Sequence, residues 1–117
     1  QDGVATQVYQ RLRGSHYSLW PALEDLAVDL HMSPSTLRRR LEREGCSFQE
    51  IKDEVRRSLA LELLCQTRAS IGEIAAQCGF QEPSAFHRAF KKWTGESPGR
   101  YRERVQGKVS RPARLGA

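Results

Sequence analysis

One pattern of apolar residues occurs twice in this chain of 117 residues, and it constrains the fold more than any other feature. The first copy comprises Leu23, Leu26, Ala27, a break at His31-Met32, then Ser35, Leu37, Leu41 and Gly45. The second comprises Ile71, Ile74, Ala75, a break at Gly79-Phe80, then Ser84, Phe86, Phe90 and Gly95. Spacings of three and four place the apolar residues on one face of a helix. Each copy therefore predicts two helices joined by a tight turn, a helix-turn-helix.

Capping signals predict where these and the other helices begin and end. Ser33 before Pro34 is typical of a helix start, and Ser47 and Ser70 each stand three residues before a Glu, the capping-box spacing. Pro21 suits the first turn of a helix. The expected helices span about 4–13, 21–30, 34–44, 48–66, 70–78, 83–93 and 98–105. Strand signals are weak, so we predict an all-α fold with about seven helices and a long central helix joining two helix-turn-helix subdomains.

The same pattern predicts how the chain is divided. We expect an N-terminal helix and linker over 1–18, a first helix-turn-helix over 19–46, a connecting helix over 47–69, a second helix-turn-helix with a closing helix over 70–105, and a flexible basic tail over 106–117. The chain starts at Gln1 rather than Met, which favours a fragment preceded by another domain.

Positive charge is clustered along the chain, which has a formal net charge of +5. Cations gather in residues 35–43, 84–93 and 100–117, whereas acids such as Glu24, Asp25 and Asp29 lie outside these clusters. A clustered basic surface is typical of nucleic-acid binding. The alternative is a set of solvated charged helix faces with no partner.

Other classes of protein are disfavoured by what the residues lack. The odd number of cysteines (Cys46, Cys65, Cys78) without a CxxC pair favours a reducing, cytoplasmic location, and no apolar run suits a membrane span. We expect no enzyme, because Cys65 and Cys78 stand on apolar faces and no base is placed beside them. We also expect no metal or other cofactor, because the three histidines have no ligand spacing. A helical protein-interaction module remains the rival.

Segment 79–102 closely resembles the signature of the AraC/XylS family of bacterial transcription regulators. The resemblance rests on Gly79, Phe80, Pro83, Phe86, Phe90, Trp93, Gly95, Ser97, Pro98, Tyr101 and Arg102. Segment 30–41 is similar to the first helix-turn-helix of that family, and the likeness covers about residues 19–104. It implies a cytoplasmic bacterial protein that associates with the nucleoid when it binds promoter DNA. Most often such a protein is an activator that contacts RNA polymerase. It also implies a separate N-terminal domain for effector and dimer contacts.

The resemblance also implies which side chains meet double-stranded DNA. Base edges would be contacted by Ser35, Arg38, Arg39, Ser84, Ala85, His87 and Arg88. Phosphates would be contacted by Thr36, Arg40, Arg43, Ser70, Ile71, Lys91 and Lys92. The residue types agree with this division, since Arg suits guanine edges and Ala suits a thymine methyl. The central helix, about 28 Å long at ~1.5 Å per residue, would place the two recognition helices in successive major grooves, which repeat every ~34 Å.

Three alternatives stay open at particular positions. Glu82 either accepts from a cytosine amino group or stands at the N-cap of the helix after it, and we favour the N-cap. The basic tail either binds DNA nonspecifically or is disordered, and we favour disorder. His31 stands where the second copy has Gly79. A side chain is less favourable than glycine at positive φ, so the first turn is either as tight as the second or less sharp.

Overall fold

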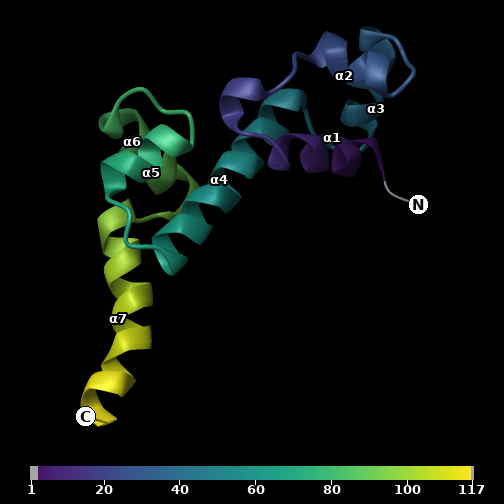
Figure 1. Ribbon diagram of the computed structural model, residues 1–117. Coiled ribbons are helices and arrows are strands. Elements are labelled where there is room, and N and C mark those ends of the chain that lie inside the picture. Colours follow the sequence, from purple (N-terminus) through teal and green to yellow (C-terminus); the bar gives the residue numbers. More distant parts are fainter. Residues whose placement is uncertain (1–2, 117) are drawn as a thin grey trace. The chain divides into compact units, whose positions relative to one another are not determined.

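The computed structural model describes the backbone of residues 3–116 and the side chains of residues 3–107. This part of the chain contains seven α-helices, one short 3-10 helix and no strand (Figure 1). The elements are α1 (Val4–Arg13), the 3-10 helix η1 (Tyr17–Leu19), α2 (Leu23–Asp29), α3 (Pro34–Arg43), α4 (Phe48–Gln66), α5 (Ile71–Gln77), α6 (Pro83–Thr94) and α7 (Pro98–Gly116). The prediction of an all-α fold is confirmed.

The chain forms two compact units, Gln1–Arg56 and Arg57–Ala117, and α4 contributes residues to both. Each unit has its own apolar core. The core of the first unit includes Val8, Leu12, Leu26, Leu37 and Leu41. The core of the second includes Ala60, Leu64, Ile74, Cys78, Phe86 and Phe90. The repeated apolar pattern therefore contributes to both cores, together with residues of α1 and α4, and the expected core role of Cys78 is confirmed.

The turns of the two helix-turn-helix motifs have the same backbone structure despite their different residues. Gly79 has φ 90° and His31 has φ 61°, so both adopt the left-handed conformation. Phe80 N donates to Ala75 O at 2.9 Å, and Met32 N donates to Ala27 O at the same distance. These bonds define a Schellman motif at the end of α5 and of α2. The side chain at position 31 has therefore not opened the first turn.

Helix α1 belongs to the core of the first unit rather than to a linker. Val4, Val8 and Leu12 on its inner face are buried there. Glu44, directly after α3, accepts hydrogen bonds from Val4 N at 2.9 Å and Ala5 N at 2.8 Å. A Cβ on Gly3 would approach Glu44 Oε1 to 2.8 Å, so glycine at this position leaves room for the carboxylate. One acidic side chain at the end of α3 thus accepts hydrogen bonds from two backbone N–H groups at the start of α1.

This contact predicts an acid-sensitive attachment of α1. The N–H groups of Ala5 and then Val4 hold the pKa of Glu44 below its ordinary value of 4.5. A lowered carboxyl pKa stabilises the folded state above the unfolded pKa, and this stabilisation is lost as pH falls through the lower folded pKa. Below about pH 4.5 we therefore expect α1 to detach more readily, and Glu44→Gln to weaken the attachment already at pH 7.

The Trp20 indole reports on this attachment, because its N–H donates to Leu12 O at 2.9 Å. Urea unfolding followed by the indole N–H resonance at pH 7 and at acidic pH would measure the change. Glu42→Gln, which alters an exposed carboxylate two residues away, is the control. Equal pH dependence in the Glu44→Gln variant and the unmodified chain would contradict the assignment.

The start of α2 differs from the prediction that Pro21 opens the helix. Helix α2 begins at Leu23, and Ala22 at its N-cap is extended. The loop before it contains η1 and is held by Trp20, whose indole also donates to Ser15 O at 3.1 Å. Trp20 is extended (φ −63°, ψ 129°), as expected before a proline, but Ala22 after the proline is extended as well, so the helix starts later than the proline alone indicates.

The final helix is longer than expected, because α7 continues past Val105 to Gly116. Gln106, expected to begin a flexible tail, donates from Nε2 to Leu64 O at 2.8 Å and to Thr67 O at 3.0 Å. These bonds extend the contact of α7 with the end of α4 beyond the predicted limit. The side chains of residues 108–117 lie outside the described residues, and flexibility of the tail stays a prediction.

Candidate nucleic-acid interface

Helix α3 turns one face to the core and the opposite face to solvent. Its start is capped by Ser33, whose Oγ accepts from Thr36 N at 3.2 Å, and Pro34 follows in the first turn. Leu37 and Leu41 are fully or almost fully buried, with relative exposures of 0% and 1%. The predicted base-contact residues of this helix, Ser35, Arg38 and Arg39, are all exposed, as are Arg40 and Arg43.

Two of these side chains already have partners within the protein. Arg39 Nη2 donates to Thr36 Oγ1 at 3.4 Å, and Thr36 itself is half-buried. Arg38 Nη2 lies 3.7 Å from Glu24 Oε2 on α2, with relative side-chain exposures of 59% and 64%. The sequence placed Glu24 away from the cationic clusters, and the fold brings it to one of them. No sequence signal short of the α2–α3 packing itself reveals this pair.

Helix α6 has the same two-faced construction. Phe86 and Phe90 are fully buried, and Phe86 contacts Phe80 with ring centroids 5.5 Å apart. The exposed residues are Ser84, His87, Arg88, Lys91 and Lys92, whereas Ala85 is half-buried. The exposed side chains of α6 are therefore short and polar at its start and cationic toward its end.

Glu82 occupies the N-cap position of α6, but its side chain makes no capping hydrogen bond. Glu82 therefore occupies the predicted N-cap position without making the hydrogen bond of an N-cap side chain. Gly95 ends the helix in the left-handed conformation, with φ 89°.

The start of α5 is already occupied by the protein's own groups. Glu73 Oε1 accepts from Ser70 N at 2.7 Å, and Ser70 Oγ accepts from Glu73 N at 3.0 Å, which confirms the predicted capping box. The hydrogen bond from the Ser70 backbone lowers the pKa of Glu73. A phosphate at Ser70 and Ile71 would have to compete with this carboxylate for the Ser70 N–H.

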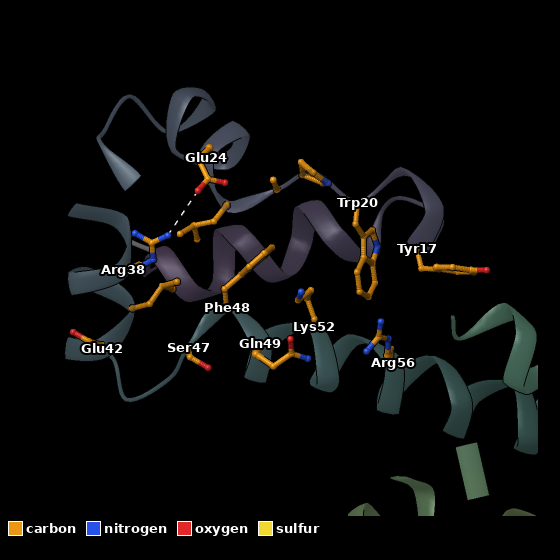
Figure 2. A pocket seen from close by; sticks show the side chains of 14 residues that line it. Tyr17, Trp20, Glu24, Arg38, Glu42, Ser47, Phe48, Gln49, Lys52 and Arg56 are labelled. Carbon is orange, nitrogen blue, oxygen red and sulfur yellow. Dashed lines mark ion pairs between the residues drawn. The ribbon is translucent and has the colours of Figure 1, made fainter. Parts of the chain in front are cut away.

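A cleft of about 740 Å³ lies within the first unit beside α3 (Figure 2). Arg38, Glu24 and Glu42 lie toward one end of it, and Trp20 and Arg56 toward the other. Sequence reasoning missed Glu42 as a neighbour of Arg38, although the spacing of four along a helix indicates a shared face. Among the described side chains, His, Cys, Asp and Glu form no group of three that could hold a metal ion. None of the described helices has the length and apolar character to cross a membrane.

Comparison with known proteins identifies the fold. Residues 26–104 match the family model described as a helix-turn-helix domain. The ornithine utilization regulator of Pseudomonas aeruginosa is 44% identical over 103 residues, which make up 88% of this chain and 30% of that protein. The chain thus spans about a third of the length of this relative.

Two solved structures have a fold similar to that of this chain. A DNA-binding transcriptional dual regulator of Escherichia coli K-12 matches with a TM-score of 0.83 and 31% identity, over 92% of this chain and 96% of that one. The DNA-binding domain of the global transcriptional factor AdpA, solved with a target DNA, matches with a TM-score of 0.72 and 27% identity, over 92% and 96%. These proteins are DNA-binding regulators rather than enzymes. The chain belongs to the AraC-type family of helix-turn-helix DNA-binding domains.

Proposed function

We propose that this chain binds promoter DNA by inserting α3 and α6 into successive major grooves. The observation that carries the proposal is the matched construction of the two helices. Each buries two apolar side chains, exposes a cationic face, and follows a turn that contains a left-handed residue. The 19-residue length of α4, about 28 Å at ~1.5 Å per residue, is close to the ~34 Å repeat of the groove.

In this proposal the exposed residues divide into two groups. Base edges are contacted by Ser35, Arg38, Arg39, Ser84, Ala85, His87 and Arg88. Phosphates are contacted by Thr36, Arg40, Arg43, Ser70, Ile71, Lys91 and Lys92. Thr36, Ile71 and Ala85 are half-buried, so each would meet DNA with the exposed part of its side chain.

The larger protein is proposed to be a bacterial transcription regulator that acts at the nucleoid, most often as an activator. Contact with RNA polymerase, and a preceding domain that binds an effector or forms dimers, are part of this proposal. The family membership of residues 26–104 supports it.

Salt dependence of DNA binding tests the proposal. Duplexes selected from a random pool by this chain would be titrated at increasing salt. Four phosphate-contacting cations (Arg40, Arg43, Lys91, Lys92) predict about a 100-fold loss of affinity between ~50 and ~200 mM salt. Arg39→Ala should cost about 1–3 kcal/mol on the selected site and relax its sequence preference. Lys92→Ala should weaken all sequences alike and reduce the salt slope by about one.

Two results would count against this function. A flat salt dependence or failure to retain any duplex would favour the helical protein-interaction module instead. Equal effects of Arg39→Ala and Lys92→Ala on selected and unrelated DNA would contradict the division into base and phosphate contacts.

A further inference from the structure

We propose that Glu24 is a positioning residue that makes Arg38 selective for guanine. This inference rests on the proposed function of α3 as a recognition helix. Glu24 lies in the first turn of α2, and its carboxylate forms an ion pair with Arg38 at 3.7 Å (Figure 2). Both side chains are more than half exposed, so the pair is open to the solvent from which DNA would approach.

The position of Glu24 relative to α3 is set by packing. Leu23, Leu26 and Ala27 bury one side of α2 in the same core that holds Leu37 and Leu41 of α3. Glu24 therefore stands on a helix whose buried side chains share a core with those of the recognition helix. A long, flexible arginine gains a preferred direction from this partner.

The other two cations that line the cleft lie over aromatic rings, whereas Arg38 is paired with Glu24. On α4, Lys52 lies over the Phe48 ring at 4.8 Å, and Arg56 lies over the Trp20 ring at 5.6 Å. Glu42, one turn after Arg38 on α3, lines the same cleft. Arg38 thus has a carboxylate partner that the neighbouring helix supplies.

This pairing has two consequences for DNA binding. A guanidinium has five N–H donors, so Arg38 keeps Glu24 with one edge while it offers the other to the O6 and N7 acceptors of guanine. On a duplex that lacks guanine there, the Glu24 carboxylate approaches the negatively charged DNA without that compensation. Unfavourable contacts with wrong partners are an established route to specificity. Glu24 should therefore weaken binding to unrelated DNA more than binding to the selected site.

Glu24→Gln tests the inference, with Asp25→Asn as the matched control. Both variants remove one negative charge from the first turn of α2, and both residues are exposed. The probes are the duplex selected by the unmodified chain and the same duplex with its sequence scrambled. For Glu24→Gln the ratio of the two affinities should fall about three- to fivefold, the upper part of the roughly 1.4- to fivefold range that one exposed ion pair contributes. For Asp25→Asn it should stay within about twofold.

A second selection from the random pool identifies the base involved. With Glu24→Gln, the preference for guanine should relax at one position, and the same position should relax with Arg38→Ala. In the Arg38→Ala background, Glu24→Gln should have no further effect on the affinity ratio. Glu24→Asp keeps the charge but withdraws it from Arg38, so it should relax the preference for guanine at the same position, and it replaces Glu24→Gln if that variant does not fold.

The outcomes separate the inference from the proposed function. If no duplex is selected or the salt dependence is flat, the proposed function fails. If DNA is bound with steep salt dependence but Glu24→Gln equals Asp25→Asn, only the role of Glu24 is overturned. An unchanged effect of Glu24→Gln in the Arg38→Ala background would likewise overturn it.

Discussion

Phe90→Ala is expected to lower the free energy of unfolding of the second unit by about 3–5 kcal/mol. Phe90 is fully buried, with ring centroids 5.7 Å from Phe86 and 5.5 Å from Tyr101. Removing the ring eliminates these contacts and leaves a cavity that rigid neighbouring helices fill only in part. Because Phe90 belongs to the core of the second unit, the first unit should keep its stability.

Each unit has one tryptophan, which makes this prediction measurable unit by unit. Trp20 packs against the first core and Trp93 against the second. Their indole N–H resonances, followed through a urea titration, report the two units separately. Phe90→Leu is the control and should cost less than about 1.5 kcal/mol, because it keeps most of the volume. Equal losses from the two substitutions, or an equal shift of the Trp20 transition, would contradict the prediction.

Arg102→Met is expected to destabilise the second unit by about 2–4 kcal/mol, because it removes several charge-assisted hydrogen bonds that are not additive. The guanidinium of Arg102 on α7 donates to four carbonyl oxygens at the end of α4 and just after it. They are Ala69 O at 2.5 Å, Thr67 O at 3.2 Å, and Leu63 O and Leu64 O at 3.3 Å each. Carbonyls at a helix end lack donors from a following turn, so the arginine acts as a cap here, although Leu63 O also accepts from Thr67 N and Oγ1.

Arg104→Met, two residues further on, is the matched control. Arg104 forms an ion pair with the half-buried Glu96 and lies over the Tyr101 ring at 5.2 Å, but it does not bond the four carbonyl oxygens, so its loss should have a smaller effect. Urea unfolding followed by the Trp93 resonance compares the two variants. Equal destabilisation would show that α7 is held by its general packing rather than by the Arg102 cap.

The local structure of this chain was largely predictable, because short-range signals decide it. Ser47 and Glu50 form the capping box that their spacing indicates, with bonds of 2.8 and 3.1 Å. The repeat likewise indicated both cores and the two outward cationic faces. The start of α2 was misplaced because Ala22 is extended, although Pro21 before it suits a helix start.

Long-range contacts account for most of what the sequence did not reveal. Glu24 and Arg38 are 14 residues apart and meet only because α2 packs on α3. Arg102 was recognised as part of a family signature, but its four carbonyl partners depend on how α7 meets the end of α4. Such pairs need the packing angle between helices, which capping and periodicity do not provide.

The bond between Glu44 and the start of α1 bears on how this domain folds while it is synthesised. Val4 and Glu44 are separated by 40 residues, which a ribosome adds in about 2–8 s at ~5–20 residues per second. An isolated helix of 10 residues is only marginally stable in water. Within the first unit, helix α1 therefore leaves the ribosome before the other helices but gains its cap and its core partners only after α3 has followed. In the first unit, the segment made earliest is completed last.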